Sequence, residues 1–222
     1  MKTKLSIALI SVLSTVSFNT NAAILITEVA PWASGNSPYA TDWFELTNTG
    51  SSAVNITGWQ MDDNSNGTAK VNLTGITSIA AGESVIFTEN AATASFLSTW
   101  FGSNVPVGLQ IGNYSGAGVG LSTTADAVNI FNSTGVLQAN VTFGLSDSFV
   151  PYQTFNNAAG INNGAISTLS QVGIDGAFVA TNDINEIGSP GTIVSAIPEA
   201  STYGMMLAGL GMVGLIARRR KA

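Results

Sequence analysis

Residues 42–48, DWFELTN, decide the fold, because large apolar side chains recur there with the two-residue period of a β-strand. Successive side chains of a strand point to opposite faces, so Phe44 and Leu46 share one face, and Trp43 and Glu45 share the other. We therefore predict a half-buried strand whose Phe44 and Leu46 side chains lie in the core.

Similar short runs, separated by Gly, Asn, Ser and Thr, continue along the chain. This pattern favours an all-β sandwich or barrel formed by one domain. The predicted strands are Ile24–Val29, Trp43–Asn48, Val54–Met61, Glu83–Glu89, Ala127–Phe131 and Val136–Phe143, the last two forming a hairpin. Helical spacing of aromatic residues predicts a short helix in Ala91–Phe101, and Ser146–Gly188 is predicted to be loops with one strand near Gly176–Ala180.

The order of several stretches resembles bacterial lamin-tail domains. These stretches are ILITEV (24–29), DWFELTN (42–48), VNITGW (54–59), GESVIF (82–87), WFG (100–102) and GSPG (188–191). The resemblance covers residues 24–191 and implies an immunoglobulin-like β-sandwich. We also expect Gly58 to turn the chain and Trp59 to insert its ring between the sheets.

The N-terminus has the three parts of a secretory signal peptide. Lys2 and Lys4 precede an apolar run over residues 5–18, and small residues follow up to position 23. We predict a signal peptide over residues 1–23, cut by signal peptidase after Ala22 or Ala23. A buried helix or a retained membrane anchor is the alternative, but the apolar run is short for a membrane span.

The C-terminus resembles a PEP-CTERM sorting signal, because IPEAS (197–201) is followed by an apolar stretch (203–217) and a basic tail. We predict a linker at residues 192–197 and a sorting signal at 198–222 with a transmembrane helix at 203–217. The resemblance implies that an exosortase-type membrane protease cuts near Pro198 and Glu199; a permanent anchor is the alternative. The predicted anchor residues are Tyr203, Leu207, Leu210, Val213, Leu215, Ile216, Arg218, Arg219 and Arg220.

The charge of the chain is unevenly distributed. Between Ala23 and Ile197, Lys70 is the one basic residue against twelve carboxylates, a net charge of −11, while the whole chain has −6. Such a surface repels phosphate backbones and disfavours nucleic-acid binding. The chain has neither His nor Cys, which excludes a Ser-His-Asp triad, a Cys-His dyad and ordinary zinc sites.

Residues 62–67, DDNSNG, fit the opening of a calcium loop, with oxygen ligands at Asp62, Asn64 and Asn66. Leu73 stands at the twelfth position, where an EF-hand needs a bidentate Glu, so an EF-hand is excluded. A weak calcium site and an ordinary polar loop remain as alternatives. No other cofactor is predicted.

These observations predict an exported, non-catalytic protein of the cell surface or extracellular matrix. It would pass through a single-pass inner-membrane intermediate with its C-terminus inside. One alternative is a module that binds exopolysaccharide or another envelope component, with or without the assistance of calcium, through the aromatic residues of predicted loops: Trp32, Tyr39, Tyr114 and Tyr152. Core or rim packing is the competing interpretation of these rings.

A hydrolase that uses paired carboxylates, drawn from Glu28, Glu45, Asp62 and Asp63, is a further, disfavoured alternative. We instead predict that Glu28 and Glu45 are structural carboxylates, which accept hydrogen bonds from backbone or Trp N–H groups.

Overall fold

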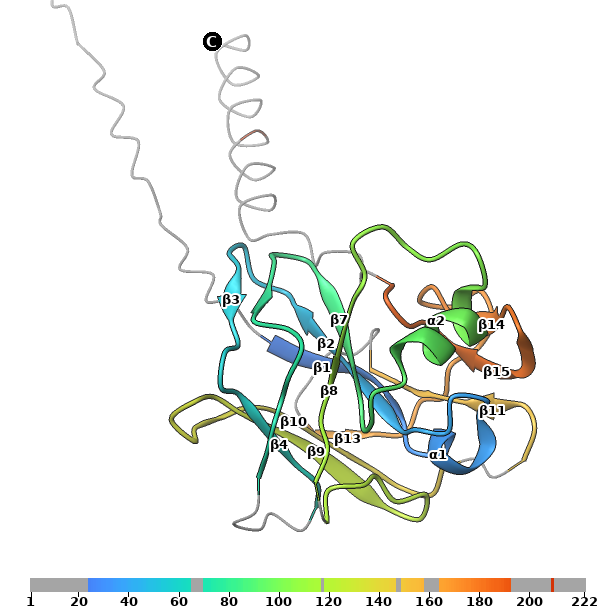
Figure 1. Ribbon diagram of the computed structural model, residues 1–222, viewed down its shortest axis with the longest axis horizontal. Coiled ribbons are helices and arrows are strands. Elements are labelled where there is room, and N and C mark those ends of the chain that lie inside the picture. The colour runs from blue at the N-terminus through green and yellow to red at the C-terminus, as the bar shows by residue number, and fades with distance from the viewer. Residues whose placement is uncertain are drawn as a thin grey trace, which may run out of the picture. The chain divides into compact units, whose positions relative to one another are not determined.

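A computed structural model describes residues 24–64, 70–116, 118–146, 149–157, 164–192 and Gly209. Asn21–Ile197 forms one compact unit. Among the described residues of that unit, the regular elements are strands apart from two short helices, so the chain has an all-β fold (Figure 1).

Two five-stranded sheets form the body, consistent with the expected immunoglobulin-like sandwich. The first sheet has the order β12 (Phe155–Asn156), β1 (Ile24–Ala30), β2 (Trp43–Asn48), β7 (Ser84–Thr88) and β8 (Gln110–Asn113). The second has the order β13 (Gly164–Ile166), β10 (Leu137–Phe143), β9 (Asp126–Phe131), β4 (Gln60–Asp62) and β5 (Val71–Asn72). Neighbouring strands are antiparallel except β7 with β8 and β10 with β13.

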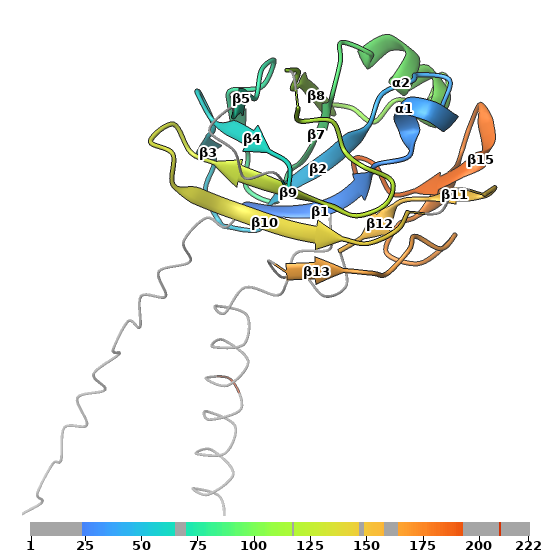
Figure 2. The same ribbon diagram turned by 90° about the horizontal axis from the view of Figure 1, so that it is seen from below.

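Two smaller sheets complete the described fold. β11 (Tyr152–Gln153), β15 (Asp183–Gly188) and β14 (Phe178–Ala180) form one, and β3 (Val54–Asn55) pairs with β6 (Ser78–Ile79) in the other. Figure 2 shows β11 and β15 beside the short helix α1 (Ala33–Asn36).

The main core lies between the two large sheets. Phe44 pairs with Phe87 across β2 and β7, and both point to the inner face, where their rings stack with centroids 5.7 Å apart. From the second sheet, Met61 and Val128 are fully buried in the same apolar cluster. The prediction that Phe44 and Leu46 belong to the core is confirmed.

The outer face of the first sheet is also buried, so the prediction that β2 is half-buried is wrong. All six residues of β2 are buried. Trp43 on this face packs against Phe96 and Trp100 of the helix α2 (Thr93–Phe101), which confirms the predicted helix. A strand face of mixed polarity in the sequence can be covered either by water or by a second layer of protein, and the pattern alone does not tell which.

The predicted strand Val54–Met61 is wrong, because the chain turns inside it. Gly58 has a φ of 74°, and the N–H of Trp59 donates to the carbonyl of Ile56. Because of this turn, β3 and β4 belong to different sheets. The expectation that Gly58 turns the chain and that the Trp59 ring enters the core is confirmed.

The region Ser146–Gly188 contains more structure than predicted. β14 confirms the strand expected near Gly176–Ala180, but β11, β12, β13 and β15 also lie there. Three of them have only two or three residues, too few to display a hydrophobic period.

Candidate functional site

A row of buried polar side chains crosses the outer face of the first sheet. Thr27, Glu28, Glu45, Thr47 and Ser84 form this row, which we call the carboxyl seam. Glu28 of β1 pairs with Glu45 of β2, and the register shift between Ile26 and Glu28 adds Thr27 to the row. The exposed fractions of Glu28 and Glu45 are 0% and 2%, so the two carboxyl groups are removed from water together.

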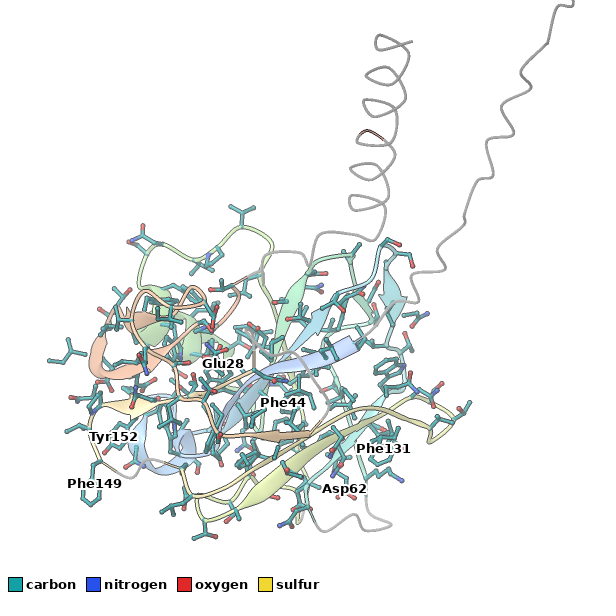
Figure 3. All side chains as sticks on the ribbon, turned by 180° about the vertical axis from the view of Figure 1, so that it is seen from behind. Glu28, Phe44, Asp62, Phe131, Phe149 and Tyr152 are labelled. Atoms are coloured by element: carbon teal, nitrogen blue, oxygen red, sulfur yellow. The ribbon has the colours of Figure 1, made fainter. Side chains whose placement is uncertain are left out.

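Glu28 is held by residues from the C-terminal third of the domain. Its Oε1 accepts hydrogen bonds from Thr154 Oγ1 at 2.5 Å and from the Ser189 N–H at 2.7 Å. Its Oε2 accepts one from Ser189 Oγ at 3.1 Å. A Cβ at Gly188 would lie 2.6 Å from Glu28 Oε1, so the strand approaches the carboxyl closely because this position is glycine. Figure 3 shows Glu28 within the domain.

Glu45 attaches the chain just after Ser189 to the first sheet. Its Oε1 accepts a hydrogen bond from Thr27 Oγ1 at 2.5 Å, and its Oε2 accepts one from the Gly191 N–H at 2.7 Å. Hydroxyl contacts continue from Thr47 to Ser84 at 2.6 Å, and Ser84 Oγ donates to the carbonyl of Thr192. The prediction that both glutamates accept backbone N–H bonds is confirmed.

The electrostatics of the seam favour protonation. Burial raises the pKa of Glu28 from 4.5 to about 7, against the opposing effect of its hydrogen bonds. Burial and the nearby Glu28 carboxyl raise the pKa of Glu45 from 4.5 to about 8. Lys70, the one basic residue of the described chain, lies over the ring of Phe131 instead. At neutral pH the pair therefore retains at least one proton.

A second buried carboxyl, Glu186 of β15, is joined to an aromatic cluster through Tyr39. The Tyr39 hydroxyl donates to Glu186 Oε2 at 3.0 Å and accepts hydrogen bonds from the indoles of Trp43 at 3.0 Å and Trp100 at 3.2 Å. Burial raises the pKa of Glu186 from 4.5 to about 7. The sequence analysis did not identify this network, because Glu186 and Trp100 lie 147 and 61 residues from Tyr39.

Three of the four aromatic residues considered for sugar stacking belong to the interior. Trp32, Tyr39 and Tyr114 are buried, so the interpretation of these rings as exposed loop platforms is wrong. Trp32 donates its indole N–H to the carbonyl of Gln153. Tyr152 is half-buried and stacks on Trp32 with centroids 5.4 Å apart. Core packing, the competing interpretation, therefore holds for these three rings.

The predicted calcium loop begins where β4 ends. Asp62 Oδ1 accepts a hydrogen bond from the Asp63 N–H, and the Asn64 N–H donates to Asp126 Oδ1. Asp126, which the sequence analysis did not select, thus connects this loop to β9. Asn66 lies outside the described residues, among which no group of three or more acidic, His or Cys side chains is arranged for a metal ion. Calcium binding by this loop stays a prediction.

The processing and anchor residues cannot be placed on this fold. Ala22, Ala23, Pro198, Glu199 and the anchor positions from Tyr203 to Arg220 lie outside the described residues. In the part of the chain that the structure describes, no helix is long and apolar enough to cross a membrane.

An open groove of about 380 Å³ lies next to the seam. It is lined by residues 80–84, residues 106–109 and Gly191. Ser84 and Gly191 connect this groove to the seam. The sequence analysis had no signal for it, because its walls come from three separate segments.

Comparison with known families identifies two parts of the chain. A family model described as Lamin Tail Domain matches residues 18–144, more than half of the chain. A model described as PEP-CTERM protein-sorting motif matches residues 196–221. Both resemblances noted in the sequence are thereby confirmed. A search of curated proteins finds no match.

Proposed function

The chain belongs to the Lamin Tail Domain family, and we propose from that membership that it is a non-catalytic protein of the cell surface or extracellular matrix. The sorting motif at residues 196–221 implies export and processing by an exosortase-type system. In this proposal the β-domain is the mature exported protein, and the C-terminal tail is the signal that directs its sorting.

The observation that carries the proposal is the sorting motif directly after the compact unit Asn21–Ile197. We place the domain at residues 24–191, the linker at 192–197 and the sorting signal at 198–222. The bonds from Ser189 and Gly191 to the seam support a domain end near residue 191. The predicted signal peptide at residues 1–23 would start the export.

The state of the acidic residues supports a non-catalytic role. A glycosidase needs two carboxyl groups that flank a bound sugar. Glu28 and Glu45 are instead enclosed, and protein hydroxyl and N–H groups bond to all four of their carboxyl oxygens. Their raised pKa values follow from burial, which also excludes substrate from them.

The test compares the full-length protein in its own host with a variant that lacks residues from Ile197 onward. The measurements are intact mass and cell fraction. We expect the full-length protein to yield a mature form on the surface or in the medium that lacks residues 1–23 and is cut near Pro198 and Glu199. We expect the truncated variant to be exported but to escape the exosortase step.

A second variant replaces Arg218, Arg219 and Arg220 with Gln and keeps the apolar stretch. This variant should impair sorting, because the basic tail is expected to fix the C-terminus inside. A mature mass that retains residues 218–221 in the inner-membrane fraction would contradict the proposal and identify a permanent anchor. Turnover of a polysaccharide by the purified domain would contradict the non-catalytic role.

A further inference from the structure

Two tight turns form the walls of the groove next to the seam. In residues 80–83 and in residues 106–109, the N–H of the fourth residue donates to the carbonyl of the first. Gly82 and Gly108 stand third in these turns, with φ of 74° and 83°, as a type II turn requires. Because glycine occupies the position that needs a positive φ, both walls are free of backbone strain.

The two walls are held together by one side chain. Gln110, which follows the second turn, donates to Glu83 Oε1 at 2.7 Å and to the carbonyl of Ser78 at 3.2 Å. Glu83 Oε2 accepts the N–H of Ala80 at 2.6 Å. Glu83 is the one charged residue among the described residues that line the groove, and both of its carboxyl oxygens have protein donors. The groove is therefore preformed, and its charged group is already engaged.

The apolar side chains of the groove are open to water. Val107 is fully exposed, Ala81 and Pro106 are exposed, and Leu109 is half-buried. None of the described lining residues is aromatic, so the groove offers no ring on which a sugar could stack. Its volume of about 380 Å³ is near the lower limit of sites for small molecules, about 300–1,000 Å³. This surface therefore suits a short aliphatic segment of chain.

The domain's last described residues lie at this groove. Gly191 lines it and lies against Leu109, since a Cβ at this glycine would be 2.8 Å from Leu109 Cδ1. The carbonyl of Thr192 accepts a hydrogen bond from Ser84 Oγ at 3.2 Å, and Ser84 also lines the groove. Consecutive Cα atoms are about 3.8 Å apart, so the next segment, residues 193–197, starts beside the groove. That segment lies outside the described residues.

We propose that residues 193–197, IVSAI, dock in this groove and cover Val107 and Leu109. Four of these five residues are aliphatic and none is charged, which matches the lining of the groove. Fully extended, five residues span about 17 Å, enough to cross a groove of this size. The compact unit that contains the groove also extends to Ile197. Burial of aliphatic side chains from both partners supplies the driving force.

Docking does not depend on the proposed function, because the groove can hold the linker whether or not the tail is sorted. Its consequence for the mature protein does rest on that function: after a cut near Pro198 and Glu199, the new C-terminus would stay bound to the domain. The competing occupant is the same linker of a second molecule. Dilution separates the two, because an intramolecular contact does not weaken as the protein concentration falls.

The test is limited proteolysis of the full-length protein in mild detergent by elastase, which cuts after small aliphatic residues. Val194 and Ala196 provide such sites in the linker. Intact mass follows the loss of the chain after either residue. Val107→Glu places a charge where the linker should pack, so we expect cleavage at these sites to become roughly tenfold faster, the effect of losing the burial of one aliphatic side chain. Ala81→Glu on the other wall should act in the same direction.

The matched control is Val136→Glu, which adds the same charge at an exposed apolar position of the hairpin between β9 and β10. Its linker should be cut as slowly as that of wild type. All three variants change exposed residues, so their Tm should stay within about 3 °C of wild type. Equal cleavage of wild type, Val107→Glu and Ala81→Glu would overturn the proposal, as would equal acceleration by Val136→Glu. Protection that is lost on dilution would overturn it too, and would assign the groove to a second molecule.

Discussion

Replacing Glu45 with Gln should reduce the dependence of the free energy of unfolding on pH. The seam binds more protons in the folded state than in the unfolded state, because the pKa values of Glu28 and Glu45 rise from 4.5 to about 7 and about 8. The free energy of unfolding therefore falls as the pH rises from 4.5 to 8. Below pH 4.5 both states are protonated and this contribution is fully present.

The size of the effect follows from the shifts. One pKa unit corresponds to 1.36 kcal/mol, so the shift of Glu28 alone corresponds to about 3 kcal/mol. The pair titrates in two steps, near pH 7 and pH 8, so we expect its combined contribution to fall by about 7 kcal/mol between pH 5 and pH 9. Glu45→Gln removes the second charge, and its amide oxygen can still accept the Gly191 N–H.

The assay is urea unfolding at pH 5, 6, 7, 8 and 9, followed by tryptophan fluorescence. We expect the variant to match wild type within about 1 kcal/mol at pH 5 and to exceed it by about 4 kcal/mol at pH 9. Glu83→Gln removes the same charge just before β7 and measures what charge removal alone does. A difference between wild type and Glu45→Gln that does not change with pH would refute the reasoning.

Three further substitutions test other contacts by the same unfolding assay. Gly188→Ala should cost about 1–3 kcal/mol, because its Cβ would lie 2.6 Å from Glu28 Oε1; Gly144→Ala, with nothing within 4 Å of its Cβ, should change little. Tyr39→Phe should cost about 2–4 kcal/mol, since it leaves two indole N–H groups and Glu186 Oε2 without this partner, and a cost below 0.5 kcal/mol would contradict the network. Phe44→Ala should cost about 3–5 kcal/mol, and a milder effect would show that the core collapses around it.

The sequence was sufficient where a local period coincides with burial. The alternation in residues 42–48 predicted β2 and its core face, and the spacing of aromatic residues predicted α2. It failed in Val54–Met61, where the strand was drawn across a change of phase: the apolar residues are Val54 and Ile56 before Gly58 but Trp59 and Met61 after it, and the positive φ of Gly58 breaks the strand there. Two-residue strands such as β11 and β12 are defined by their partners and have no period of their own.

The seam shows a second limit of local patterns. Glu28 and Glu45 could be predicted to be structural carboxylates, but their partners could not be identified. The donor Ser189 lies 161 residues from Glu28, and Gly191 lies 146 residues from Glu45. The outward position of Glu45 on its strand would by itself favour contact with water. That face is buried only because later segments of the chain pack over it.

These partners also indicate how far the folding unit extends. The family match ends at residue 144, yet the seam depends on Thr154, Ser189 and Gly191. A chain cut at residue 144 would leave Glu28 and Glu45 without those donors, and β1 without β12. We infer that the folding unit reaches residue 192. In a chain exported from its predicted N-terminal signal, the last of these bonds would then form only when the residues just before the sorting motif have crossed.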